Sequence, residues 1–469
     1  MKYYSPFNKS IQDLNPSDLN NLKIVSEGWY IEYKRQLPDS ISIAKSISAF
    51  ANTYGGWLFI GINEESKENP VAGDFPGVPS IDIDSSLQRL RKSAADSLNP
   101  TPYFETNVLH GPDEECGLQN GYAVICVWVP QSNNAPHIHK TGRIYRRVSD
   151  ASEPKAENDR FVLDQLWRRS DNINNIYKTW YDKDPEFSPN EKNFPFIRIM
   201  LVADRWMSRD INIDFNEDEV RTALSESSHI SSIPFDTVYT HGDMFIGRQL
   251  KGNDPFNLGL TWTLRRNLVS DVIVPLPFYS FDNLTIISDE LDGYIFKDFF
   301  SSTLNGFNIK KGRVIDLNYL FSVLIGVAGI QDRLCHMAKW KEGYHFKIKI
   351  LNSWRTIPFL DVHSVIQRFE KNGPPMILNS TSSLPRGTDP ETYISIPKYT
   401  DIDDPGDRVQ HQGSFMFTAI ALLFGIPPWL DKPENDPDGM DYYQELYNAA
   451  KRALDAQTKR NIRQGLLSI

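Results

Sequence analysis

Cysteine and long apolar runs are scarce in this sequence. Only three cysteines occur, and none forms a CxxC pair: Cys116, Cys126 and Cys335. This number excludes a disulfide framework and predicts a cytoplasmic protein in a reducing compartment. The longest apolar run, residues 415–426, has about a dozen residues, whereas a membrane span needs roughly 18, so we expect a buried helix and no membrane partner. Residues 1–17 lack the apolar core of a signal peptide, and we therefore expect no export.

Positive charge is also in deficit. The chain has 50 Lys and Arg against 60 Asp and Glu, which gives a formal net charge of -10. This balance argues against a protein that coats nucleic acid non-specifically, although an acidic chain can still carry one basic face. Internal repeats and low-complexity tracts are absent, and Gly55–Gly56 is not followed by the GK[ST] of a phosphate-binding loop. ATP binding is therefore the weakest functional hypothesis.

The residues that are present predict a folded α+β chain. Hydrophobic residues make up 40% of the 469 residues, which at roughly 150 residues per domain leaves room for about two or three domains. Alternating or continuous apolar residues predict strands over 30–34, 57–62, 122–129 and 143–148. Helical spacing predicts helices over 39–53, 85–98 and 160–170, the first with Asp39 or Ser40 as its N-cap. These elements form an N-terminal mixed α/β domain.

A second, larger region follows. The polar stretch 171–193 predicts a linker, which puts the domain boundary near residue 180 and divides the chain into 1–180 and 181–469. Beyond it we expect strands within 195–203, 241–250 and 271–281 and helices within 317–340 and 441–467. This α+β region, in one or two subdomains, is expected to sense or regulate, with a trigger or partner that the sequence does not identify.

Acidic residues surround the first predicted strand. Glu32 and Lys34 share one face of that strand, about 6.6 Å apart, and Glu27 precedes them by five residues. Glu64 follows the next strand, where a sheet can bring it beside Glu32. Carboxylates are the ligands that Mg²⁺ and Mn²⁺ prefer, and a nearby lysine stabilises charge on a phosphate. The alternative is a solvated strand face followed by a surface turn.

The segment "IEYK" followed by "AFANTYGGWLFIGINEESKENPVAG" closely resembles the AlbA-type domain of the Schlafen family. The signature of that domain is a V-E-F-K strand, an A-F-A-N-T-x-G-G helix end, a strand ending in I-G-V, and an acidic turn before V-x-G. The later "GRIYRRVSDAS" resembles the closing segment of the domain, so the resemblance covers about residues 20 to 170.

This resemblance implies a metal-dependent endoribonuclease that cuts tRNA or similarly structured RNA, with an antiphage or stress-defence role by analogy. Nuclease members use three carboxylates and a divalent cation, here Mg²⁺ or Mn²⁺. Their positions fall on Glu27, Glu32 and Glu64, although the nuclease members have Asp at the third position. The second hypothesis is a non-catalytic nucleic-acid-binding module or transcriptional regulator, because a fold does not guarantee chemistry.

A basic segment precedes the end of the N-terminal domain. No carboxylate occurs between Cys116 and Ser149, and the end of this stretch holds our candidates for the RNA-facing surface: Lys140, Arg143, Tyr145, Arg146 and Arg147. The alternative is a strand whose arginines pair with acids elsewhere. His137 and His139 share a strand face, where phosphate contact or plain exposure is favoured over a metal site. Because the signature occurs once, we expect a symmetric homodimer that places two basic segments along one structured RNA.

Overall fold

The computed structural model describes residues 4–148, 153–209, 211, 215–225, 235–249, 258–340, 342–398, 402–426 and 440–463. The fold is α+β. The chain forms two compact units, one made of Met1–Asp182 with Trp206–Asp210 and the other of Lys183–Arg205 with Ile211–Ile469. The division after Asp182 lies beside the boundary that the sequence marks near residue 180.

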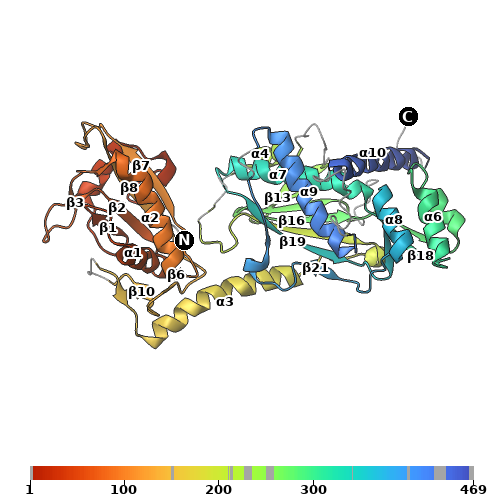
Figure 1. The fold of residues 1–469 in the computed structure, drawn as a ribbon, viewed down its shortest axis with the longest axis horizontal. Helices are drawn as coiled ribbons and strands as arrows, with labels where there is room; N and C mark the ends of the chain where they lie inside the picture. The colour runs from red at the N-terminus through yellow and green to blue at the C-terminus, as the bar shows by residue number, and fades with distance from the viewer. Residues whose placement is uncertain are drawn as a thin grey trace. The chain divides into compact units, whose positions relative to one another are not determined.

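The first unit is built around a small mixed sheet (Figure 1). Its strand order is β1 (Ile31–Lys34), β2 (Gly56–Ile60), β8 (Tyr122–Val129) and β5 (Val78–Pro79), and β7 (Glu105–His110) also pairs with β8. The parallel β1–β2 pair is joined by α1 (Ser40–Asn52), whereas β2 and β8 are antiparallel. Helices α1 and α2 (Ile83–Ser97) cover one face with apolar side chains, and the N-terminal segment with η2 (Pro16–Ile24) covers the other.

Local residue chemistry explains where α1 begins and ends. The Asp39 carboxylate accepts hydrogen bonds from the backbone N–H groups of Ile41 and Ser42, at 2.9 and 3.0 Å, which confirms the predicted N-cap. At the other end the Asn52 side chain donates to the carbonyls of His137 and Tyr145, at 3.1 and 3.0 Å. The end of α1 is therefore tied to the basic segment far along the chain.

Two predicted elements are wrong at their ends. The strand expected over 143–148 is reduced to β10 (Tyr145–Arg146), which pairs with β11 (Lys155–Ala156). The helix expected to stop at residue 170 continues as α3 (Arg160–Asp182), so the first half of the predicted linker is helical. Its buried residues keep a helical spacing through the polar stretch: Leu166, Ile173, Tyr177 and Trp180.

The second unit contains a larger antiparallel sheet. Its strands, in spatial order, are β13 (Thr237–His241), β14 (Met244–Arg248), β15 (Thr261–Arg265), β16 (Val269–Pro275), β12 (Phe196–Val202), β19 (Tyr344–Leu351) and β21 (Ser382–Leu384), with β22 (Ile394–Ile396) also on β19. Helices α7 (Asn318–Met337), α9 (Pro405–Leu423) and α10 (Met440–Arg463) contribute to its main hydrophobic core, and α7 packs against both α9 and α10 (Figure 1).

Smaller elements complete the second unit. A three-stranded sheet of β17 (Phe278–Phe281), β18 (Gly312–Asp316) and β20 (Thr356–Phe359) accompanies α4 (Glu217–Ser225), α5 (Leu284–Glu290), α6 (Lys297–Gly306) and α8 (His363–Asn372). The single strand expected over 271–281 is thus wrong, because the chain changes sheets between β16 and β17. Most of the apolar run 415–426 lies in the largely buried helix α9, which ends at Leu423. Across the described ranges, every helix is too short or too polar to cross a membrane.

We predict that Gly55→Ala destabilises the first unit much more than Gly142→Ala. Both glycines have φ of +77°, a conformation that costs an L-residue about 1–2 kcal/mol. An added Cβ at Gly55 would also lie 2.8 Å from the Gln131 nitrogen and the Val129 oxygen, whereas at Gly142 it would meet no described atom within 4 Å. Urea unfolding should therefore show an extra loss of about 1–3 kcal/mol for Gly55→Ala. Equal losses would contradict this account.

Candidate functional site

A buried ion pair lies at the centre of the first unit. Glu32, on β1, is only 1% exposed, and its Oε2 lies 3.0 Å from Nη1 of Arg147. Its other oxygen, Oε1, accepts a hydrogen bond from the Ser46 hydroxyl at 3.0 Å and lies 3.2 Å from Nζ of Lys34. Both carboxylate oxygens of Glu32 are therefore already engaged by donors from β1, α1 and the basic segment.

Arg147 is completely buried and satisfied on several sides. Its Nε donates to the Gly28 carbonyl at 3.0 Å, Nη2 donates to the Ile31 carbonyl at 3.3 Å, and the guanidinium lies 4.9 Å from the Phe50 ring centroid. Burial lowers the pKa of Arg147, and the Glu32 and Glu27 charges oppose that shift. The prediction that Arg147 contacts RNA is corrected, because its side chain has no exposed surface.

The remaining basic-segment residues differ in their surroundings. Tyr145 is buried, with Nζ of Lys45 at 5.3 Å from its ring centroid, so it does not present a face for base stacking as the sequence predicted. Arg146 pairs with Glu157 at 2.8 Å and is mostly covered. Only Lys140 and Arg143 among the five candidates are exposed.

The predicted histidine pair is also buried. His137 and His139 are each 1% exposed, which corrects the expectation of phosphate contact or plain exposure. Nδ1 of His137 lies 2.6 Å from the Pro100 carbonyl oxygen, and burial lowers the pKa of His137 to about 4. His137 is therefore neutral at pH 7 and supports the packing beneath α1.

Glu27 has the environment most typical of a functional carboxylate. Its Oε1 accepts a hydrogen bond from the backbone N–H of Tyr33, whereas its buried Oε2 has no partner among the described residues. Burial raises the pKa of Glu27 to about 7, and the charges of Glu64 and Glu32 add to this shift while the Tyr33 N–H and Lys34 oppose it. The structure thus brings all four predicted residues into one electrostatic group, which we call the acid group: Glu27, Glu32, Lys34 and Glu64.

The acid group fits a divalent cation only in part. Its oxygen donors suit Mg²⁺ or Mn²⁺, and Oε2 of Glu27 is available for coordination. Glu64 is exposed on β3 (Asn63–Glu64), which pairs with β4 (Ala72–Asp74). As placed, no three His, Cys, Asp or Glu side chains in the described part of the chain form a ready metal-binding cluster. The acid group therefore offers one unpartnered carboxylate oxygen, on Glu27, while Oε1 of Glu32 is already paired with Lys34.

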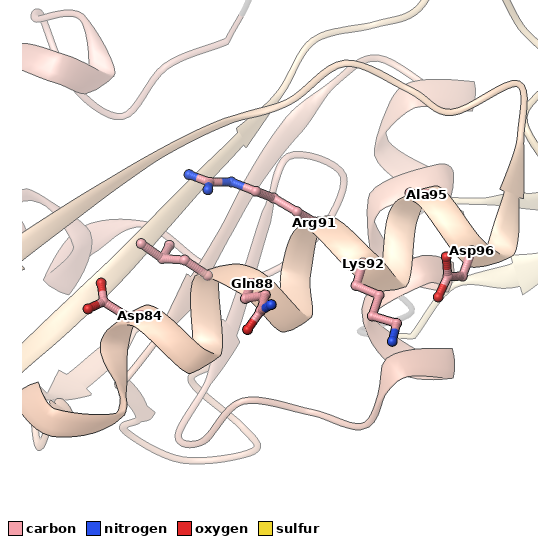
Figure 2. Close-up of a pocket in the computed structure, with 7 residues that line it drawn as sticks. Asp84, Gln88, Arg91, Lys92, Ala95 and Asp96 are labelled. Atoms are coloured by element: carbon pink, nitrogen blue, oxygen red, sulfur yellow. The ribbon is translucent and has the colours of Figure 1, made fainter.

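The exposed side of α2 carries mixed charge. Arg91 and Lys92 line an open hollow of about 650 Å³ together with Asp84 and Asp96. Figure 2 shows these two acids toward opposite ends of the helix. Two acids balance two bases, so this side of α2 does not extend the basic segment. Arg89 points elsewhere and donates to the Pro38 carbonyl.

A comparison with protein families identifies the first unit. Residues 27–156 match the family described as "Schlafen, AlbA_2". The chain contains a Schlafen AlbA-type domain. Such a domain indicates a function related to nucleic acids. The matched range runs from Glu27 through β11, and so includes the whole acid group and Arg147.

Other comparisons add little to this Schlafen domain. No protein of curated function matches the chain. Among solved structures, the DIP2311 protein from Corynebacterium diphtheriae is 14% identical, with 35% of this chain and 26% of that chain covered and a TM-score of 0.18. The present chain therefore spans about a quarter of that protein, and the similarity carries no argument about fold or function.

Sequence reasoning missed the residues that hold the acid group in place. Ser46 and the Gly28 carbonyl contact Glu32 and Arg147 directly. The available signal was weak: Ser46 lies 14 residues from Glu32 on a helix whose apolar face dominates its pattern, and a carbonyl acceptor carries no sequence signal.

We predict that Arg147→Met strongly destabilises the Schlafen domain, whereas Arg143→Met, at an exposed arginine, changes its stability by no more than about 0.5 kcal/mol. Removing Arg147 leaves the Glu32 charge buried without its main partner, a change that costs about 3–5 kcal/mol. Urea unfolding of the full chain measures both. Adding Glu32→Gln to Arg147→Met should recover part of the loss, and a wild-type transition for Arg147→Met would refute the central role of this pair.

We also predict a distinctive pH dependence for the metal-free protein. Because the pKa of Glu27 rises from 4.5 to about 7 on folding, the folded state binds a proton more tightly than the unfolded state in that interval. Stability attributable to Glu27 is therefore present below pH 4.5 and is lost as the pH rises to about 7. In EDTA, Glu27→Gln should melt at a higher temperature than wild type above pH 7 and should show a flatter pH profile. Glu68→Gln, at an exposed glutamate, is the control; identical profiles for all three proteins would contradict the assignment.

Proposed function

We propose that the Schlafen domain is a metal-dependent endoribonuclease whose catalytic centre is the acid group. The observation that carries this proposal is the buried Oε2 of Glu27, which lacks a hydrogen-bond partner among the described residues. A buried carboxylate oxygen without a hydrogen-bond partner is unfavourable, and so is the repulsion between neighbouring carboxylates. A bound cation would reduce both of these free-energy costs. Such arrangements are enriched at catalytic sites.

Each member of the acid group has a separate part in this proposal. Glu27 and Glu64 would hold Mg²⁺ or Mn²⁺ together with Oε1 of Glu32. Arg147 holds Glu32 in place from the protein interior through the other carboxylate oxygen, Oε2. The cation, when bound, supplies Lewis acidity toward water and a phosphate oxygen. Lys34 has a side chain that is 31% exposed, and its ammonium can attract the phosphate to the acids.

The substrate proposal is tRNA or a similarly structured RNA, bound partly through the exposed Lys140 and Arg143. An antiphage or stress-defence role rests on analogy with Schlafen relatives. The second unit is proposed to regulate the nuclease in response to an unidentified trigger. Since only two of the five basic-segment candidates are exposed, a symmetric homodimer is one way to lengthen the phosphate-binding surface.

A non-catalytic nucleic-acid-binding module is the second candidate, and one observation favours it. Both oxygens of Glu32 are already engaged, by Arg147 on one side and by Ser46 and Lys34 on the other. In this reading the acid group is a structural network. Glu27 and Glu64 then distinguish the two functions. Neither acid makes as many contacts as Glu32, so replacing either one tests cation binding without breaking the network.

We predict that Glu27→Gln lowers Mn²⁺-dependent cleavage of total tRNA by about 10²-fold or more, because the neutral amide is a poor cation ligand. Glu64→Ala should also lower cleavage, and its exposed position keeps the fold intact. Glu68→Ala, at an exposed glutamate between β3 and β4, should cleave like wild type. Cleavage that survives EDTA, or that is unchanged in Glu27→Gln, would overturn the nuclease. RNA binding without any cleavage would establish the binding module instead.

A further inference from the structure

Four aromatic side chains form a connected group at the surface of the Schlafen domain. The Tyr4 and Tyr30 rings are stacked, with centroids 4.7 Å apart and planes at 27°. Tyr54 contacts both Tyr30, at 6.2 Å, and Trp29, at 5.6 Å. We call these four residues the aromatic group: Tyr4, Trp29, Tyr30 and Tyr54. They come from three separate segments of the chain.

The aromatic group has a fixed base and an exposed outer side. Tyr30 packs against a hydrophobic core cluster beneath it. Tyr54 is 47% exposed and Tyr4 is 38% exposed, although both carry large apolar rings. Isolated exposed aromatics are common on proteins, but here rings in mutual contact remain open to solvent. Their planes are tilted, by 39° between Tyr30 and Tyr54 and by 57° between Trp29 and Tyr54, so the group presents several aromatic faces at one place. Such a surface suits another planar ring.

Arg147 connects the aromatic group to the acid group. Trp29 and Tyr30 directly follow Gly28, whose carbonyl accepts from Nε of Arg147. Tyr54 directly follows Thr53, whose hydroxyl oxygen accepts from the backbone N–H of Arg147 at 2.9 Å. The same arginine holds Glu32. The aromatic rings and the carboxylates are therefore attached to one rigid set of hydrogen bonds.

A cation also lies near the exposed ring. The charge of Arg169, on α3, interacts with Tyr54, and Nη1 of Arg169 donates at 3.1 Å to the carbonyl of Asn52. Proteins commonly bind unpaired bases with aromatic side chains that lie next to basic ones. The rings stack on the bases, and the cations contact the phosphates.

We propose that the aromatic group is a stacking surface for unpaired bases of a single-stranded nucleic acid, and that it positions the strand beside the acid group. A paired duplex hides its base faces, so this surface selects loops, bulges and ends. The proposal deepens the proposed nuclease by naming which part of a structured RNA enters the site. Binding through the aromatic group is measured independently of cleavage.

The test compares two strands that carry the same phosphates. The full-length chain, in EDTA to prevent cleavage, is titrated with an oligouridylate and with an abasic ribose-phosphate strand of equal length. Wild type should bind the oligouridylate about 10-fold or more tightly than the abasic strand, because base stacking adds to phosphate contact. Trp29→Ala and Tyr54→Ala should lose most of this preference without changing the salt dependence of affinity, since no phosphate contact is removed.

Two matched variants separate stacking from folding. Tyr54→Phe keeps the ring and should retain the preference, which excludes a role for the hydroxyl. Tyr122→Ala removes an exposed tyrosine, 41% accessible, from β8 of the same domain and should bind both strands like wild type. Equal wild-type affinity for the two strands, or an unchanged preference in Tyr54→Ala, overturns the stacking surface. Loss of cleavage in Glu27→Gln leaves this result unaffected, and absence of any cleavage refutes the nuclease while leaving the stacking surface intact.

Discussion

The ion pair between Glu32 and Arg147 is the interaction on which the Schlafen domain depends. Burying two charges is costly unless their hydrogen-bonding groups are satisfied, and here Ser46, Lys34 and the Gly28 carbonyl complete the set. The pair joins the first strand, the first helix and a segment 115 residues further along the chain. Both the acid group and the surface aromatic rings take their positions from it.

Much of this domain could be predicted because its signals are local. The alternation in β1 puts Glu32 and Lys34 on one face, and the Asp39 cap with apolar spacing defines α1. The inward turn of Arg147 was not predictable in the same way, because its neighbour Arg146 has the same chemistry and only the position of the distant Glu32 distinguishes them. The sequence does not predict the end of α3, because polar residues surround Ile173, which continues the buried face of the helix.

The basic segment shows why a stretch without acids need not form a basic surface. Arg146 and Arg147 pair with Glu157 and Glu32, which lie outside the stretch. The second unit repeats this use of charge. Its adjacent strands β12 and β19 bury Arg198 and Lys349, whose partners Asp271 and Asp184 come from other segments: Arg198 contacts both acids, and Lys349 contacts Asp184. In both units, cations that appear free in the sequence stabilise long-range contacts.

The long separation between Glu32 and Arg147 has a consequence during protein synthesis. The ribosome makes the three acids first and the arginine much later, so a nascent chain that stops before residue 147 cannot assemble the centre. The acid group therefore folds only after nearly all of the domain has been synthesised. This order of synthesis delays the proposed activity until the chain has been extended past Arg147.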